Sequence, residues 1–221
     1  MVIKKILAKF RLVTLYILNF SHYMLNFFKH PKPVFPKNNT SGLKINLGAG
    51  NINMQGWINI DARNLAHIHL VTNTLQLSEF SDNSISEIYL CHVLEHFSFH
   101  DVEKILVDIH KKLKVNGLIR ISVPSFDALV EVYLNNARNL EIIKFALMGG
   151  QNYEYNFHKA VFNRECLTNL LIKNGYTNPM EWKTQDDFGI DLGDWSNKYY
   201  LTKKNNVQIS LNIKAKKIDK K

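Results

Sequence analysis

The sequence predicts an α/β protein in which a mostly parallel β-sheet carries helices on both faces, because apolar strand-like runs alternate with helical patterns. Two further observations favour this class: a Gly-Ala-Gly turn follows the first run, and an aspartate ends the second. Ligands of such sheets bind beyond the carboxyl ends of the strands. We therefore expect the binding site to include the stretch from Leu43 to Asp61, together with the loops after Val71 and from Cys91 onward.

The elements follow from apolar periodicity and from glycine or proline boundaries. Seven runs predict strands: Lys44–Leu47, Trp57–Ile60, His69–Val71, Ser86–Cys91, Leu118–Val123, Met180–Lys183 and Val207–Ala215. Three stretches predict helices: Asp101–Lys114, Phe126–Leu147 and Arg164–Asn174. In the first helix, Asp101 is the expected N-cap and Asn116-Gly117 the expected stop.

The bulk properties describe a globular chain with basic ends. The 221 residues carry a formal net charge of +9 and are 46% hydrophobic, which fits one domain with appendages. The two cysteines are far apart and form no CxxC pair, so we expect a reducing, cytoplasmic environment. We divide the chain into a basic apolar helix with a Pro-rich linker (1–42), one folded domain (43–217) and a basic tail (218–221).

The N-terminal segment, residues 3–28, is apolar, rich in aromatic residues and basic at its front. Its continuous apolar runs are shorter than the about 20 residues that a membrane-spanning helix needs. It also lacks the small-residue cleavage site of a signal peptide. The segment either makes peripheral contact with the anionic inner face of a membrane or packs on the domain, and the sequence leaves both alternatives open.

The glycine turn favours a nucleoside ligand over a dinucleotide. Gly48 and Gly50 permit close backbone approach, but the third glycine of a dinucleotide fingerprint and the GK[ST] phosphate loop are both missing. NAD and ATP bound in those ways are therefore disfavoured. Asp61 can accept hydrogen bonds from two ribose hydroxyls, and the alternative is an aspartate that caps a turn or helix.

The block from Asp82 to Phe97, with Asp-Asn-Ser, Ile-Tyr and His-Val-Leu-Glu-His, resembles the class I S-adenosylmethionine-dependent methyltransferases. The resemblance is to a small bacterial group of the type 11 kind, and it covers residues 43–217. It implies a Rossmann-like sheet of seven strands whose last strand is antiparallel. It also implies a methyltransferase domain that uses S-adenosyl-L-methionine as its cofactor.

The same resemblance assigns the cofactor residues. The first strand and glycine turn would hold the cofactor, Asp61 its ribose, and the loop after the fourth strand its methionine end. The family usually has an acidic or polar residue after the third strand, where this chain offers Thr72 and Asn73. The predicted cofactor-binding residues are Leu47, Gly48, Ala49, Gly50, Asp61, Asn73, Cys91 and His92.

Methyl transfer to an oxygen usually needs a general base, and histidine suits this role near neutral pH. We predict His96, His158 and His92 as catalytic residues, although any of them could instead be a hydrogen-bonded packing residue. The order His92-x-x-Glu95-His96 also suggests a metal site. It is not the H-E-x-x-H motif and shows no third ligand, so the sequence predicts no metal.

The sequence specifies the acceptor of the methyl group least of all. Gly149–Gln151 and Asn156–Lys159 resemble a lid, which favours substrate contact by His158. We expect a small molecule or a glycan as the acceptor, because aromatic residues with nearby acids between 183 and 205 could stack on and hydrogen-bond a sugar. A solvated loop explains that second stretch equally well. Nucleic-acid methylation is disfavoured by the near-neutral body of the chain and by the absence of an [ND]-P-P-[YF] loop. A non-catalytic scaffold is the third alternative, against which Gly48, Gly50 and Asp61 argue.

Overall fold

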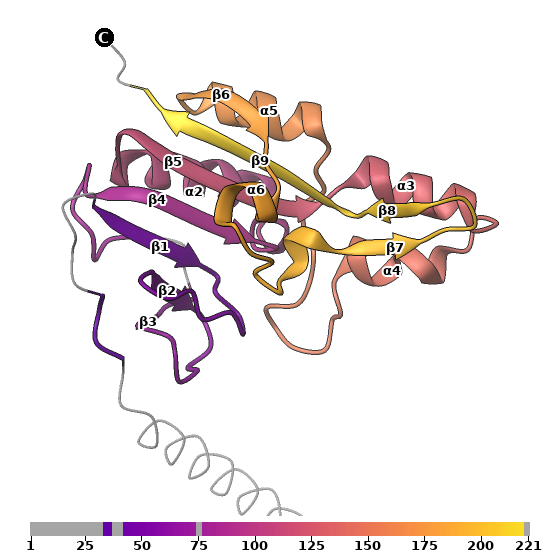
Figure 1. Ribbon diagram of the computed structural model, residues 1–221, viewed down its shortest axis with the longest axis horizontal. Helices are drawn as coiled ribbons and strands as arrows, with labels where there is room; N and C mark the ends of the chain where they lie inside the picture. The colour runs from indigo at the N-terminus through magenta and orange to yellow at the C-terminus, as the bar shows by residue number, and fades with distance from the viewer. Residues whose placement is uncertain (1–32, 37–41, 74–76, 219–221) are drawn as a thin grey trace, which may run out of the picture.

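The structure is a computed structural model that describes residues 33–36, 42–73 and 77–218. Within these ranges, seven strands form one sheet in the order β3-β2-β1-β4-β5-β9-β6 (Figure 1). The neighbours in the run β3, β2, β1, β4 and β5 all pair in parallel. Strand β9 is antiparallel to both of its neighbours, β5 and β6. The strands of this sheet are β1 (Leu43–Leu47), β2 (Ile58–Asp61), β3 (Leu70–Val71), β4 (Ile85–Cys91), β5 (Leu113–Pro124), β6 (Tyr176–Glu181) and β9 (Ser210–Lys217).

This arrangement confirms the predicted fold class, with seven strands and an antiparallel last strand. The helices are α2 (Phe99–Lys112), α3 (Phe126–Asn135), α4 (Leu140–Met148), α5 (Arg164–Lys173) and α6 (Thr184–Phe188), with the 3₁₀ turns η1 (Leu94–His96) and η2 (Trp195–Asn197). A second sheet pairs β7 (Tyr199–Leu201) with β8 (Asn206–Gln208). The sequence did not predict this second sheet.

The two boundaries predicted for the first helix are wrong. Ser98, and not Asp101, is the N-cap of α2, because the Ser98 side chain accepts a hydrogen bond from the Asp101 N–H. The helix ends at Lys112, since Leu113 is fully buried as the first residue of β5. Asn116, at φ 63°, lies in a β-bulge of β5, where the register with β4 shifts.

Two other predicted elements are each divided in the structure. The helix predicted from Phe126 to Leu147 breaks into α3 and α4 at Ala137 and Arg138, whose φ values are 57° and 58°. Asn139 then caps α4 by accepting from the Glu141 N–H. The break lets the apolar faces of the two helices pack on each other. The strand predicted over residues 207–215 likewise divides at residue 209 into β8 and β9.

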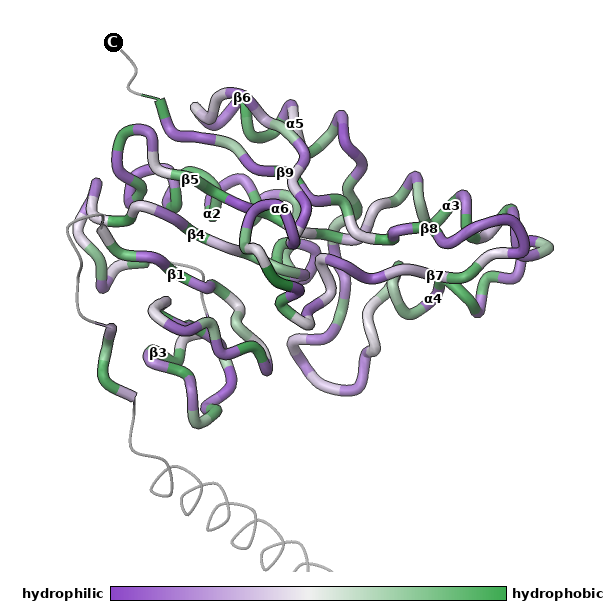
Figure 2. Tube along the Cα trace, in the orientation of Figure 1, coloured by the Kyte–Doolittle hydropathy of each residue, from purple (hydrophilic) through white to green (hydrophobic). Residues whose placement is uncertain are grey.

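The two faces of the main sheet are covered differently. Side chains alternate along each strand, so on β4 Ile88 and Leu90 face the large core beneath α2 and α5, and Tyr89 faces the other side. Figure 2 shows this alternation of hydrophobic and hydrophilic residues along the strands. On the second face, Tyr89 packs with Trp182 and with Phe188 of α6, at ring-centroid distances of 5.7 and 5.5 Å.

A lobe projects beyond the carboxyl ends of the parallel strands, at the right of Figure 1. It consists of α3, α4 and the β7–β8 hairpin around a separate apolar cluster. The binding site predicted at these strand ends therefore lies between the sheet and this lobe.

A partly buried ion cluster joins α6 to the second face of the sheet. The Asp187 carboxylate accepts from Arg120 Nε at 2.9 Å and from Lys214 Nζ at 2.7 Å, and Arg120 also pairs with Glu87. Burial alone would raise the pKa of Asp187, but Lys214 and Arg120 outweigh it and the pKa lies below its usual value. Asp187 therefore stabilises the fold in its charged form.

We expect Asp187→Asn to lower the free energy of unfolding at pH 7 by about 2 kcal/mol, less than the roughly 3–5 kcal/mol of a fully buried pair. Because the folded-state pKa is depressed, this stabilisation is present above the unfolded pKa of about 3.9 and is lost as the pH falls through the folded pKa. Urea unfolding at pH 7 and near pH 3 should show a smaller acid loss for Asp187→Asn than for the wild type. The exposed neighbour Asp186, changed to Asn, is the control; an equal acid loss in the wild type and Asp187→Asn would contradict the prediction.

The helix predicted for residues 3–28 lies outside the described residues, as does most of the predicted linker. Among the residues that the structure does describe, no helix is long and apolar enough to cross a membrane.

Candidate active site

A cavity of about 620 Å³ lies at the carboxyl ends of β1, β2 and β4. Its volume is within the roughly 300–1,000 Å³ range of small-molecule sites. The lining residues include all those predicted to bind the cofactor: Leu47, Gly48, Ala49, Gly50, Asp61, Asn73, Cys91 and His92. The predicted catalytic residues His96 and His158 line the same cavity. The fold thus gathers residues that are up to about a hundred positions apart in the chain into one site.

The glycine turn folds back over the end of β2. The N–H groups of Gly48 and Ala49 both donate to the Ile60 carbonyl, at 2.8 and 2.9 Å. Gly48 has φ 72°, and a Cβ atom built on it would stand 2.3 Å from a methyl carbon of Val93. The turn therefore requires glycine here both for its backbone conformation and for its contact with the loop after β4.

Asp61 organises the turn and faces the cavity. One carboxylate oxygen accepts from the Gly50 N–H at 2.7 Å, and the other accepts from the N–H and Nε of Arg63 at 2.8 and 3.1 Å. A carboxylate has about four acceptor positions, so two ribose hydroxyls would compete with Arg63. The Arg63 side chain is 37% exposed and lies over the Tyr153 ring, which gives it an alternative contact. The sequence analysis did not identify Arg63.

Two buried asparagines beneath the turn were also missed. Asn46 donates to the Asn59 side-chain oxygen at 3.0 Å, and that oxygen also accepts from the Met54 N–H. Asn59 in turn donates to the side chain of Asn53. These bonds tie β1 and β2 to the residues after the glycine turn. A polar residue inside a buried strand was the only signal for them in the sequence, because such a residue must find hydrogen-bond partners.

The residues after β4 and β3 form the adjoining walls. His92 has φ 54° and donates its N–H to the Ser122 carbonyl at 2.8 Å, which turns the chain sharply at the strand end. Burial raises the pKa of the Cys91 thiol, so Cys91 is a neutral wall residue. Asn73 lies at the wall after β3, where the methyltransferase resemblance places the adenine amine.

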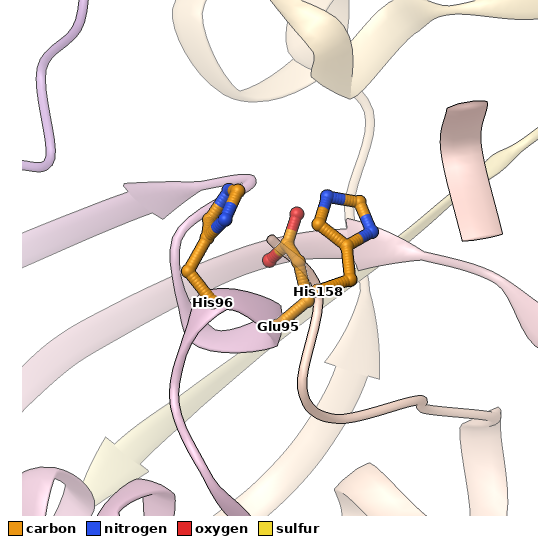
Figure 3. Close-up of side chains that lie close together, drawn as sticks. All are labelled: Glu95, His96 and His158. Atoms are coloured by element: carbon orange, nitrogen blue, oxygen red, sulfur yellow. The ribbon is translucent and has the colours of Figure 1, made fainter. Parts of the chain in front are cut away.

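Glu95 is fully buried behind the cavity wall, with His96 and His158, which line the cavity, beside it. Figure 3 shows its carboxylate between the two imidazole rings. One possible ligand atom from each of the three side chains lies within 4.8 Å of the others. The two rings meet edge to face at 4.8 Å. His158 is held there because the N–H groups of Lys159 and Ala160 both donate to the Glu95 carbonyl.

The electrostatics of this cluster favour a charged Glu95. Burial by itself would raise the pKa of the carboxyl, but His92 first, then His96 and His158, outweigh it, so the pKa lies below its usual value. Burial also lowers the pKa of His158, and nearby His96 adds to that effect, whereas Glu95 opposes it. The sequence analysis considered Glu95 only within a metal motif and assigned it no role.

His92 is fixed by hydrogen bonds on its far side. The Ser210 hydroxyl donates to the Trp195 carbonyl at 2.7 Å, so at 2.8 Å it must accept from His92 Nε2. His92 Nδ1 lies 3.2 Å from a Glu95 oxygen. His92 therefore lies between Ser210 and Glu95 and contacts both.

The side of the cavity away from the glycine turn comes from the lobe. Phe145 stacks on Trp195 at 5.7 Å, and the same indole lies 5.6 Å from the His92 ring. The segment that resembles a lid supplies Tyr153, Tyr155 and other lining residues. Of the acidic and aromatic stretch between 183 and 205, only residues 193–195 reach the cavity.

No family model matches the sequence, and no curated protein matches it. Solved structures do resemble it. An S-adenosylmethionine-dependent methyltransferase from Archaeoglobus fulgidus superposes with a TM-score of 0.50 at 14% identity, covering 92% of this chain and 94% of that one. This chain has the class I S-adenosylmethionine-dependent methyltransferase fold. At this identity, the likeness establishes the fold alone.

Two further structures illustrate the range of proteins with a similar fold. A possible exported protein from Bordetella parapertussis has a TM-score of 0.50 at 11% identity and covers 90% of this chain and 67% of that one. The 1,6-didemethyltoxoflavin N1-methyltransferase of Burkholderia thailandensis, solved with S-adenosylhomocysteine, gives 0.48 at 14% identity over 80% and 72% of the two chains.

Proposed function

We propose that this protein is an S-adenosylmethionine-dependent methyltransferase. The observation that carries the proposal is that one cavity joins the glycine turn and Asp61 to His96 and His158. S-adenosyl-L-methionine would place its ribose at Asp61, its adenine near Asn73 and its methionine end at Cys91 and His92. Its methyl group would then point toward His96 and His158.

Such a site needs to orient two reactants and to activate one of them. In methyl transfer, a lone pair of the acceptor forms a bond to the methyl carbon while the carbon–sulfur bond breaks, and the cofactor leaves as neutral S-adenosylhomocysteine. The acceptor must also lose its proton. The cofactor supplies the reactive group, and the protein supplies orientation and electrostatics. His96 and His158, which line the cavity, would act on the acceptor.

We place the acceptor among small molecules and glycans. The cavity wall combines the aromatic rings of Phe145, Tyr153 and Trp195 with the polar residues Glu154 and Asn156. Sugars suit such a surface because aromatic rings pack on their apolar faces while polar groups hydrogen-bond their hydroxyls. The basic segment at residues 3–28 would suit an acceptor held at the inner face of a membrane, such as a lipid-linked saccharide.

Calorimetric titration with S-adenosyl-L-methionine tests the function. We expect the wild-type protein to bind, and Asp61→Ala to weaken binding by at least about tenfold, or 1.4 kcal/mol, because it removes the ribose acceptor and frees the Gly50 turn. Asp127→Ala, at an exposed position of α3, is the matched control and should bind as the wild type does. An absence of binding by the folded wild-type protein would refute the proposal.

A second measurement separates the acceptor classes. Retention on RNA or DNA that falls steeply with salt would favour a nucleic-acid acceptor over a glycan.

Co-sedimentation with anionic vesicles tests the N-terminal segment. Equal pelleting of the full-length chain and of a chain without residues 1–40 would remove the membrane proposal.

A further inference from the structure

We propose that Glu95, His96 and His158 bind a divalent transition-metal ion, with an open position toward the cavity. The sequence analysis predicted no metal because His92-x-x-Glu95-His96 offered no third ligand. The fold supplies that ligand from sixty-two positions further along the chain, since 158 minus 96 is 62. One carboxylate oxygen and two imidazole nitrogens form the donor set.

The distances suit a site that contracts around an ion. The three candidate ligand atoms lie within 4.8 Å of one another. Bonds of about 2.0–2.2 Å to imidazole and carboxylate place neighbouring ligand atoms about 3.0–3.5 Å apart, so the side chains need to close by about 1–2 Å. The approach would come from rotation of the His96 and His158 side chains, because the backbone around His158 is held by hydrogen bonds to Met148 and Glu95. Glu95 and His96 lie on the single turn η1, which sets them side by side.

Three buried polar atoms of this cluster have no hydrogen-bond partner among the described residues. Glu95 is fully buried, yet neither of its carboxylate oxygens has a hydrogen-bond partner, and the same is true of the buried Nδ1 of His96. The His92 nitrogen approaches Glu95 at 3.2 Å without the alignment of a hydrogen bond. Buried polar groups are almost always satisfied, so the exceptions need an explanation. A cation coordinated by these atoms would satisfy them.

The surroundings have the features of an outer shell. The His158 ring lies beside the backbone of Ala146, which favours a proton on the ring. Metal-binding histidines usually donate their second ring N–H to a backbone carbonyl, a carboxylate or water. His92, itself anchored by Ser210, supports Glu95 from behind. The Glu95 backbone carbonyl accepts the two N–H groups that follow His158, so the two chain segments are joined at the site.

Two histidines and one carboxylate select a particular class of ion. Imidazole and carboxylate together suit first-row divalent ions such as Zn²⁺, Mn²⁺, Fe²⁺ or Co²⁺, and three protein ligands leave positions for water or substrate. The role of the ion rests on the proposed function: it would bind the hydroxyl of a methyl acceptor and lower the pKa of that hydroxyl. That would help the hydroxyl lose its proton to solvent before it attacks the methyl group.

Metal titration of the chelator-treated, full-length protein tests this site without the cofactor. We expect calorimetry with Zn²⁺, and visible absorption with Co²⁺, to show one tightly bound ion per chain. Glu95→Gln and His158→Gln should each weaken binding by at least about a hundredfold, and His92→Gln by about 10–100-fold, as expected for a supporting residue. His100→Gln, at an exposed position of α2, should bind as the wild type does.

The controls keep the result interpretable. Circular dichroism and thermal melting establish that each variant is folded, and His158→Gln, in a surface segment, serves if Glu95→Gln does not fold. The proposal is overturned if the wild type binds no ion, or if folded His158→Gln retains wild-type affinity. Because the titration contains no S-adenosyl-L-methionine, its failure is distinguishable from failure of the methyltransferase proposal, which the cofactor titration decides separately.

Discussion

Gly48→Ala is expected to weaken S-adenosyl-L-methionine binding by at least about a hundredfold, or 2.7 kcal/mol. The new methyl group would stand 2.3 Å from a Val93 methyl carbon, and Val93 is buried in the main core. The backbone at Gly48, with φ 72°, also disfavours alanine by about 1–2 kcal/mol. Relief requires the glycine turn and the loop after β4 to separate, and these two segments are the proposed cofactor walls.

The same change should lower the free energy of unfolding by about 3 kcal/mol, the sum of overpacking and backbone strain. For a chain of this size, that corresponds to a fall in Tm of about 6–12 °C. Thermal melting and calorimetric titration of one preparation measure both effects.

Gly56→Ala provides the matched control. Gly56 has φ 77°, but a Cβ atom there would meet nothing within 4 Å. We expect it to lose only about 1 kcal/mol of stability and no cofactor affinity. The double variant Gly48→Ala/Val93→Ala should recover part of the lost affinity because it removes the clashing methyl groups. If Gly48→Ala and Gly56→Ala changed stability and cofactor affinity equally, the contact between Gly48 and Val93 would not be the cause of either loss.

His158→Ala is expected to lower methyl transfer by about 100–10,000-fold, the usual contribution of a positioned acid–base or activating group. Its affinity for S-adenosyl-L-methionine should remain within about threefold of the wild type, because the proposed cofactor contacts lie at the ends of β1, β2, β3 and β4 and not on the segment that carries His158. This separation of transfer from cofactor binding distinguishes a residue that acts on the acceptor from one that shapes the cofactor site.

The measurement is transfer of an isotope-labelled methyl group from S-adenosyl-L-methionine to acceptors in an extract of the native small-molecule and glycan pool. His100→Ala, outside the cavity and exposed on α2, is the control and should transfer at the wild-type rate. Unchanged transfer by His158→Ala, or a matching loss of cofactor affinity, would contradict the assigned role.

The glycine-turn half of the cavity was predictable from the sequence because its residues are local. Gly48, Gly50 and Asp61 lie within fourteen positions, since 61 minus 48 is 13, and they end adjacent parallel strands that a short connection joins. Parallel strands place their carboxyl ends at one edge, so the pattern along the chain determines proximity in space. The hydrogen bond from Gly50 to Asp61 is the direct consequence.

Helix boundaries were less predictable because competing signals lay close together. Ser98 and Asp101 are both good caps, and the chain uses Ser98 because Asp101 in the first turn can then accept from the Ser98 hydroxyl. The division of residues 126–147 into two helices depends on packing: Val132 and Ile143 bury each other's faces only if the chain reverses between them. Periodicity along one segment does not contain that information.

The sequence by itself determined the sheet, the glycine turn and the acid that faces it, because strand periodicity and turn chemistry are local properties. Only the tertiary structure decided what Glu95 does. The burial of its carboxylate and the arrival of His158 beside it both depend on the segment after α4 folding back against η1. Contacts between residues sixty or more positions apart arise from packing of the whole domain, which no spacing of residues along the chain records.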